Sequence, residues 1–153
     1  MATTDSATRS LVISCPTDGA LNRVPGGRLG QNPKCGKCGH PLFQSRTLVL
    51  DSANFDLHAS RSDLPLVIDF WAGWCQPCRM MSPAFEAAAA LLEPRVRLGK
   101  LDTEAEQAIA ARYRIQGIPC LIMISKGREI ARTAGAMMTP GIVKWVEQAL
   151  ASI

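Results

Sequence analysis

The sequence has no apolar run that approaches the roughly 18 residues of a membrane-spanning helix, which excludes an integral membrane protein of the helical class. Its first ten residues, MATTDSATRS, lack the apolar stretch of a signal peptide, so we expect a cytoplasmic protein. Repeats and low-complexity tracts are absent as well. With 153 residues, 47% of them apolar, the chain has room for one packed domain, alone or with a small appendage.

Acidic residues are scarce in the first third of the chain. Residues 1–46 hold six basic and two acidic side chains, whereas residues 47–153 are balanced, so the formal charge of +4 belongs to the N-terminal part. A small basic module could bind nucleic acid or an acidic partner. Because no basic run exceeds two adjacent charges, an ordinary solvated surface is the favoured interpretation, and nucleic acid is not an expected partner.

Apolar residues are also sparse before residue 46, where Gly, Pro, Asn and Lys are common. A segment this short buries too little apolar surface to fold unaided, so it needs a cross-link such as a structural metal ion or a disulfide. The six cysteines stand at positions 15, 35, 38, 75, 78 and 120. In a reducing cytosol, paired cysteines indicate a metal site or catalysis rather than structural disulfides.

From residue 47 onward, strand and helix patterns alternate, which predicts an α/β fold with a mixed central sheet flanked by helices. Thr103 and Glu106 are expected to form a capping box at the start of the third helix. We expect strands at 47–51, 64–72 and 95–102, a hairpin over 120–135 turning at Lys126-Gly127, and helices at 52–60, 75–93, 104–115 and from Thr139 on, the last with Ile142, Val146, Ala149 and Leu150 on one stripe.

The segment WAGWCQPC lies where an apolar strand passes into a helix. Cys75 would stand at the helix N-terminus, where free N–H groups and the helix dipole favour a thiolate. Two cysteines one turn apart can close a disulfide and reopen it by thiol exchange. A zinc site at this pair is the weaker alternative because no second pair flanks it, and two core cysteines are the remaining one.

Residues 47–153 resemble thioredoxin over their whole length, through VIDFWAGWCQPC, RYRIQGIPC and AGA at 134–136. The resemblance implies the thioredoxin fold and the reduction of disulfides in client proteins, with a flavoprotein thioredoxin reductase restoring the dithiol. Cys75 then matches the attacking cysteine and Cys78 the resolving one. Asp69 matches a buried aspartate that helps to move the proton of the resolving thiol, and Lys100 matches a lysine near that aspartate. Burying a carboxyl in LVIDFW is costly unless it has a use, although an Asp at a surface or cap is the alternative.

The resemblance also implies a substrate-binding rim around a cis-proline, Pro119. The rim residues that match the family are Trp71, Trp74, Gly117, Ile118 and Gly135, and core packing is an equal alternative for Trp71. Two positions depart from the family pattern. Gln76 replaces a glycine between the cysteines, and Cys120 replaces a threonine after the proline. We interpret Cys120 as a small buried hydrophobe rather than a redox group.

Residues 11–45 resemble the N-terminal zinc ribbon of the bacterial thioredoxin 2 group, through ALNRVP and CGKCGHPLF. That group has two Cys-x-x-Cys pairs, whereas Asp18 stands here at the fourth ligand position. Carboxylate oxygen is an accepted zinc ligand, so one structural Zn²⁺ in a Cys₃Asp site is the leading interpretation. His40 as the fourth ligand and no metal at all are the alternatives. The predicted ligands are Cys15, Asp18, Cys35 and Cys38.

The predicted organisation is a flexible tail at 1–10, a zinc-ribbon module at 11–46 and a thioredoxin domain at 47–153. The leading hypothesis is a protein-disulfide reductase that acts with a thioredoxin reductase and disulfide-containing clients. The rival is an adaptor, in which the ribbon binds an acidic protein or nucleic acid and the thioredoxin domain is a scaffold. We expect the cores of the two parts to be separate.

Overall fold

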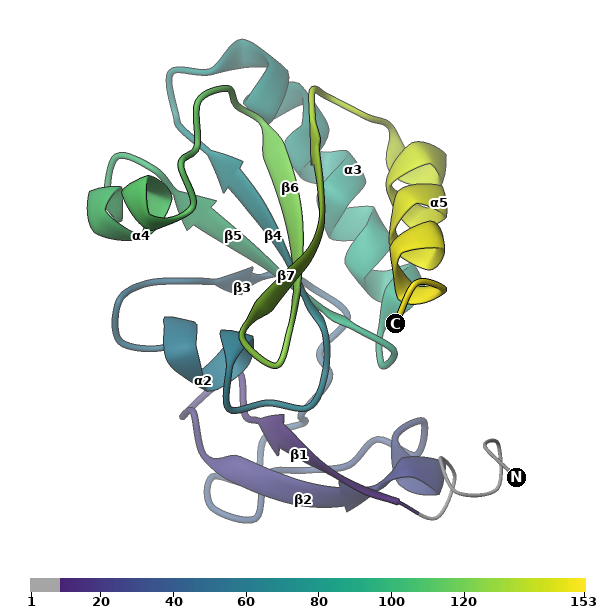
Figure 1. The fold of residues 1–153 in the computed structure, drawn as a ribbon. Helices are drawn as coiled ribbons and strands as arrows, with labels where there is room; N and C mark the ends of the chain where they lie inside the picture. Colours follow the sequence, from purple (N-terminus) through teal and green to yellow (C-terminus); the bar gives the residue numbers. More distant parts are fainter. Residues whose placement is uncertain (1–8) are drawn as a thin grey trace.

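The structure, a computed structural model, describes residues 9–153 and consists of a small N-terminal module set against one end of a larger α/β module (Figure 1). The small module contains strands β1 (Ser10–Ser14) and β2 (Leu21–Pro25), which pair antiparallel, and a 3₁₀ turn, η1 (Gly26–Arg28). Most of the tail expected at 1–10 lies outside the described residues. Ser10, assigned to that tail, is the first residue of β1.

The larger module has a mixed central sheet, as predicted, and its five strands lie in the order β3-β5-β4-β6-β7. Strands β3, β4 and β5 are parallel, and β6 and β7 are antiparallel to their neighbours. The strands are β3 (Leu48–Val49), β4 (Leu66–Trp71), β5 (Arg97–Asp102), β6 (Cys120–Ser125) and β7 (Arg128–Ala134). The helices are α2 (Phe55–Ala59), α3 (Gln76–Leu92), α4 (Gln107–Arg112) and α5 (Thr139–Leu150).

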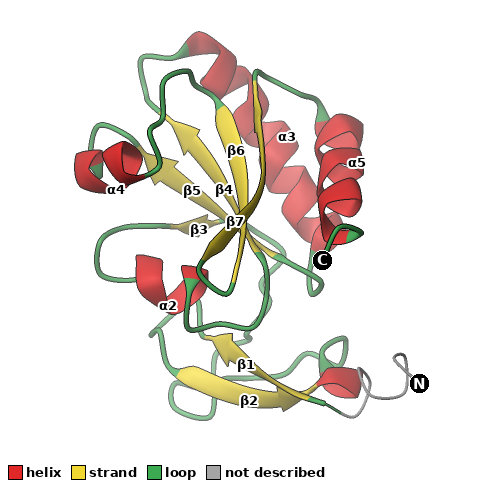
Figure 2. Ribbon diagram, viewed as in Figure 1, coloured by secondary structure: helices red, strands yellow, loops and turns green. Residues whose placement is uncertain are grey.

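Helices α3 and α5 pack on one face of the sheet, and α2 and α4 lie on the other (Figure 2). Strand β4 is therefore covered on both faces, which is why its sequence is apolar at every position except Asp69 rather than alternating. Ile142, Val146 and Ala149 form the buried stripe of α5, as expected, with Leu150 partly buried beside them. Along the described part of the chain, no helix has the length and apolarity required to cross a bilayer.

The predicted capping box is wrong. Helix α4 begins at Gln107 and its cap residue, Glu106, makes no side-chain capping bond. The Thr103 hydroxyl donates instead to the carbonyl of Trp71 at 3.1 Å. The loop after β5 is turned by Asp102, whose Oδ1 accepts the N–H of Glu104 at 2.9 Å. The Thr103 hydroxyl, which the local sequence pattern predicted to cap the helix, thus forms a tertiary hydrogen bond with the end of β4.

The N-terminal module has a small core of its own, which contains one residue of the larger module. The core consists of Ile13, Cys15, Val24, Cys35 and Leu42 together with Leu64, all buried. The expectation of separate cores therefore holds except at Leu64. The neighbouring residue, Asp63, forms two hydrogen bonds with Val12 of β1. Asp63 Oδ2 accepts the Val12 N–H, and the Asp63 N–H donates to the Val12 carbonyl, both at 2.7 Å.

Arg97, at the start of β5, joins the two modules. Its guanidinium is 3% exposed and donates to the carbonyls of Leu42 at 2.8 Å and Ser14 at 3.1 Å, both in the N-terminal module. It also forms an ion pair with Glu93 at 3.1 Å. Because β5 runs parallel to β4, Arg97 marks the end of the sheet at which β4 begins. The small module is docked at that end of the sheet. The residues that follow β4 lie at the other end, one strand length away.

Candidate functional site

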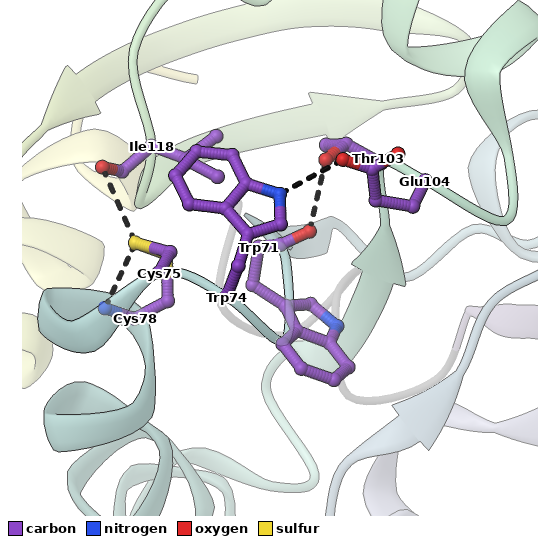
Figure 3. The surroundings of a disulfide bond; sticks show 7 residues. All are labelled: Trp71, Trp74, Cys75, Cys78, Thr103, Glu104 and Ile118. Carbon is purple, nitrogen blue, oxygen red and sulfur yellow. Dashed lines mark hydrogen bonds between the residues drawn. A yellow bond between two sulfur atoms is a disulfide. The ribbon is translucent and has the colours of Figure 1, made fainter.

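Cys75 and Cys78 form a disulfide at the N-terminus of α3, just beyond the end of β4 (Figure 3). Cys75 is the N-cap residue, and its Sγ accepts the N–H of Cys78 at 3.3 Å. Their Cα atoms are 5.3 Å apart, and the two residues are 4% and 1% exposed. After reduction, the same N–H and the helix dipole would stabilise a Cys75 thiolate.

The loop before β6 faces this disulfide. The peptide bond between Ile118 and Pro119 is cis, as expected, and the Ile118 carbonyl oxygen lies 3.8 Å from Cys75 Sγ (Figure 3). Gly135 donates its N–H to the Pro119 carbonyl at 2.9 Å and has φ +99°, a value that favours glycine. Gly117 precedes Ile118 and is exposed, with open space beside its Cα. The structure thus brings Ile118, Pro119 and Gly135 together next to the sulfur atoms.

The two tryptophans of this region differ in accessibility. Trp74 is 71% exposed, and its ring N–H donates to Glu104 Oε1 at 2.8 Å (Figure 3). Trp71 is half-buried, and the Lys100 ammonium lies over its ring, 4.6 Å from the centroid. Trp74 therefore presents an aromatic face to solvent beside the disulfide, whereas Trp71 packs beneath a cation. No pattern in the sequence had singled out Glu104.

Asp69 lies in the middle of β4 and is fully buried. Neither of its carboxyl oxygens has a hydrogen-bond partner among the described residues. Burial raises the pKa of Asp69 to about 7, against the opposing attraction of Lys100. Lys100 pairs with Asp69 in the β4–β5 register, but its Nζ donates to Ser82 Oγ at 2.6 Å. Ser82 was missed in the sequence, although it stands one helical turn after Cys78 and so on the same face of α3.

Cys120, the departure after the cis-proline, is a free thiol on β6 opposite Phe70 of β4. It is 4% exposed, and burial raises its pKa above the ordinary value. A protonated, buried thiol is a poor nucleophile. These surroundings fit the interpretation of Cys120 as a small hydrophobe.

Four side chains of the N-terminal module form a cluster, in which the ligand atoms of Cys15, Asp18, Cys35 and Cys38 all lie within 4.8 Å of one another. The Sγ atoms of Cys15 and Cys38 are 3.7 Å apart, and Cys35 Sγ lies 3.6 Å from Asp18 Oδ1. In a tetrahedron with Zn–S of about 2.3 Å and Zn–O of about 2.0 Å, the corresponding edges measure about 3.8 and about 3.5 Å. These two edges fit a tetrahedral zinc ion, and the four side chains are the ligand types that zinc accepts.

The two loops that supply these ligands have the same backbone geometry. In the first, Cys15 accepts the N–H of Gly19 on its carbonyl at 2.9 Å, and Gly19 has φ +77°. In the second, Cys35 accepts the N–H of Gly39 in the same way at 2.9 Å, and Gly39 has φ +79°. Asp18 thus occupies in the first loop the position that a cysteine occupies in the second.

His40, the alternative ligand, is exposed and outside the cluster. Its carbonyl accepts the N–H of Cys35 at 2.9 Å. The equivalent bond in the first loop joins Cys15 N–H to the Ala20 carbonyl at 2.8 Å, so His40 corresponds to Ala20 in the fold of the knuckle. Asp18 Oδ1 also accepts the Ala20 N–H, and this bond lowers the pKa of Asp18. The geometry favours Asp18 over His40 as the fourth ligand.

Comparison with known proteins extends both resemblances. The thioredoxin family model matches residues 46–148, and the model described as "Thioredoxin 2, N-terminal", a zinc ribbon, matches residues 14–40. Thioredoxin C-3 of Corynebacterium nephridii is 41% identical over 140 residues, which cover 92% of this chain and 96% of that protein. A thioredoxin of Haemophilus influenzae is 31% identical over 104 residues, 68% of this chain and 97% of the relative.

Solved structures agree with this assignment. A mutant thioredoxin from Halobacterium salinarum superposes with a TM-score of 0.61 at 25% identity, over 69% of this chain and 91% of the other. Chloroplastic thioredoxin z gives a TM-score of 0.62 at 27% identity, over 69% and 96% of the two chains. With the Cys75–Cys78 pair at the start of α3, these relatives identify a thiol-disulfide oxidoreductase. The chain belongs to the thioredoxin family and joins a thioredoxin domain to the N-terminal zinc-ribbon module of the thioredoxin 2 group.

Proposed function

We propose that this protein reduces disulfides in client proteins through Cys75-Gln76-Pro77-Cys78, and that its N-terminal ribbon holds one structural zinc ion. The observation that carries the proposal is the disulfide at the N-terminus of α3, with the Cys78 N–H directed at Cys75 Sγ. Insulin reduction in the presence of dithiothreitol, followed as turbidity, tests it. A rate no higher than that of dithiothreitol alone would leave the adaptor alternative, in which the ribbon binds an acidic protein or nucleic acid.

In the proposed reaction, the Cys75 thiolate attacks one sulfur of the client disulfide. A mixed disulfide forms, and the second client sulfur leaves as a thiolate that takes a proton from water. The Cys78 thiol then gives up its proton and attacks Cys75 Sγ, and the first client sulfur leaves as a thiolate that takes up the proton released from Cys78. The client gains two electrons and two protons, and the protein is left with the Cys75–Cys78 disulfide. A thioredoxin reductase would return the two electrons.

Asp69 is the proposed acceptor of the Cys78 proton. Its carboxyl has a pKa of about 7, so both protonation states are populated near neutral pH, as a proton carrier requires. Its oxygens have no hydrogen-bond partner among the residues described, which leaves the lone pairs free to accept. Lys100, held by Ser82, is proposed to moderate the pKa of Asp69 by its charge rather than by contact.

The proposed client surface surrounds the sulfur atoms. Trp74 offers an exposed ring, the Ile118 carbonyl lies next to Cys75 Sγ, and Gly135 is bonded to Pro119. Gly117 and Trp71 belong to the proposed rim as well. Gly117 leaves room above its Cα for a client chain, whereas the contribution of Trp71 is to pack under Lys100. An extended client segment would contact the ring of Trp74 and the cis-proline loop next to the sulfur atoms.

The zinc ion would be held by Cys15, Asp18, Cys35 and Cys38 and would supply folding energy to a module with a small core. We expect the purified protein to contain about one zinc per chain. Asp18→Ala should weaken zinc binding by at least about tenfold because one of four ligands is lost. Asp18→Cys should retain or raise the affinity, since thiolate is a good zinc ligand. Metal content after dialysis against a mild chelator measures this.

His40→Ala is the matched control for the metal prediction, since His40 lies beside the cluster but outside it. We expect this variant to keep its zinc under the same chelator. Zinc lost from the His40 variant and kept by the Asp18 variant would overturn the assignment. Circular dichroism of both proteins separates loss of a ligand from loss of the fold.

Removal of the metal by a strong chelator should leave most of the insulin-reducing activity. The disulfide lies at the opposite end of β4 from the docked ribbon, and Leu64 is the one residue of the larger module in the ribbon's core, as far as the described residues go. Acid should also release the metal, because the ligand thiolates take up protons. Activity measured before and after chelation, and after zinc is restored, checks the expectation. A complete loss that zinc restores would mean that the ribbon supports the active site directly.

We propose further that residues 11–46 and 47–153 are the two functional parts and that the protein acts in the cytoplasm. The free thiols of Cys15, Cys35 and Cys38, which meet in the metal cluster, fit a reducing compartment, and this motivates the location. Electron transfer from a thioredoxin reductase to client disulfides would be its role there. Fractionation of cells that express the tagged chain tests the location.

A further inference from the structure

A hollow of about 330 Å³ opens on the surface of the N-terminal module. Three cationic side chains line it, and each comes from a different segment. Arg23 belongs to β2, Arg28 ends η1, and Lys34 lies in the strand-like segment that leads to Cys35. The lining residues belong to β2, to η1 and to the segment that follows, all in the small module. This module lies at the end of the molecule away from the start of α3 (Figure 1).

The remaining walls are apolar apart from one amide. Val24, Pro25 and Pro33 supply the apolar surface, and Gln31 supplies an amide that can donate and accept hydrogen bonds. Among the described residues, no aromatic side chain lines the hollow. A binding site for single-stranded nucleic acid would use aromatic rings on which bases stack, so the lining disfavours that ligand.

Backbone hydrogen bonds fix the frame that carries the three cations. Strand β2 is paired along its length with β1. Gly26 N–H donates to the Arg9 carbonyl at 2.7 Å, and Gln31 N–H donates to the Arg28 carbonyl at 3.1 Å. Leu42 N–H closes the other side by donating to the Pro33 carbonyl at 3.0 Å. The hollow is therefore set by the fold and not by side-chain placement alone.

The positive charge of the hollow is uncompensated within residues 9–153. None of Arg23, Arg28 and Lys34 takes part in an ion pair there, whereas five other cations do. Asp18 is the only acidic residue between 9 and 46, and it is part of the metal cluster. Three cations that face one concave site without an acid repel each other, and an anion bound between them removes that cost.

We infer that this hollow binds a small organic compound with two phosphate groups, a ligand that the proposed disulfide reduction does not require. Guanidinium forks match phosphate oxygens in bidentate fashion, and a lysine adds a point charge. Three cations match two phosphates better than a single carboxylate. The volume is at the lower end of the roughly 300–1,000 Å³ of small-molecule sites, and a concave shape suits such a ligand better than a flat protein surface. The apolar walls and Gln31 would contact the part of the compound between its phosphates.

Titration of the full, zinc-loaded chain with fructose 1,6-bisphosphate, observed by ¹⁵N–¹H NMR, tests the inference. We expect saturable shifts of the amide signals of residues 23–34, with a Kd below about 1 mM at low ionic strength. The affinity should fall several-fold in about 0.3 M NaCl because the contacts are exposed to solvent. Arg28→Gln should weaken binding by at least about fivefold, since a charge-assisted bond is lost.

Lys144→Gln is the matched control, because Lys144 is an exposed cation on α5 outside the hollow. It should leave the affinity unchanged, and both variants should reduce insulin at the parental rate. The inference fails if signals 23–34 do not respond at about 5 mM ligand, a concentration that would saturate a submillimolar site. It also fails if Arg28→Gln binds as the parent does. Binding of a glutamate-rich peptide or an oligonucleotide with no response to the bisphosphate would overturn it in favour of a macromolecular partner.

Discussion

Cys75→Ser is expected to lower insulin reduction by at least about a thousandfold, because a serine hydroxyl at this position neither ionises near neutral pH nor forms a disulfide. Cys75 stands at the N-cap of α3 and its sulfur accepts the Cys78 N–H, so it is the sulfur prepared to ionise and attack. Turbidity of insulin with dithiothreitol as the electron donor measures the loss. Circular dichroism establishes that the variant is folded.

Cys120→Ser is the control for this prediction and should keep most of the activity. Cys120 is buried, outside the disulfide, and its pKa is raised. Cys78→Ser adds a second check, since it should trap a mixed disulfide between Cys75 and the client that intact mass measurement detects. Loss of activity in a folded Cys120→Ser protein would contradict the assignment of catalysis to Cys75 and Cys78.

Asp69→Asn is expected to stabilise the oxidised protein, and more so at high pH. The pKa of Asp69 is raised from 3.8 to about 7 in the fold. Between these values the folded state binds the proton that the unfolded state has lost, so the free energy of unfolding decreases as pH rises through this window. At about 1.4 kcal/mol per unit, the decrease reaches about 4 kcal/mol above pH 7. The Asn side chain is itself buried without hydrogen-bond partners, and this costs about 1–3 kcal/mol, so the net stabilisation is smaller by that amount.

Guanidinium chloride unfolding at pH 5 and pH 8 measures this effect. Relative to Asp69→Asn, the parent should lose stability between the two values. The buried groups His58 and Glu93, whose pKa values are also shifted, contribute alike to both proteins. Asp56→Asn is the control, because the Asp56 side chain is 76% exposed and should leave the pH dependence as it is. Parallel pH dependences in the parent and the Asp69 variant would show that the carboxyl is not the group responsible.

Asp69→Asn should also reduce insulin about tenfold more slowly near pH 7, because its amide cannot accept the Cys78 proton.

The active site could be predicted from the sequence because its residues follow local rules. A mainly apolar strand that ends in Cys-x-x-Cys predicts Cys75 at a helix N-terminus, and the resemblance to a zinc ribbon with two equally spaced pairs predicts Asp18 at the position equivalent to Cys38. The contacts that were missed depend on segments far apart in the chain. Ser82 receives Lys100 across 18 residues, and the hydroxyl of Thr103 reaches back 32 residues to Trp71.

Arg97 illustrates the same limit most clearly. In RVRLGKLD it looks like an ordinary surface residue at the start of a strand. It is buried because the ribbon covers it, and its partners in the ribbon lie 83 and 55 residues earlier at Ser14 and Leu42. No periodicity within the strand carries that information, since the burial of one end of β5 is decided by the docking of another module.

The arginine that joins the modules has a consequence for how such a chain can evolve. A thioredoxin domain without a ribbon gains nothing from Arg97, because the carbonyls of Ser14 and Leu42 would be missing and Glu93 would be its remaining buried partner. Conversely, a ribbon transplanted onto a domain that lacks this arginine would lose the donor to the carbonyls of Ser14 and Leu42. Ribbon and arginine are therefore expected to be inherited together. A lineage that discards the ribbon should soon replace Arg97, and with it Leu64, by residues suited to water.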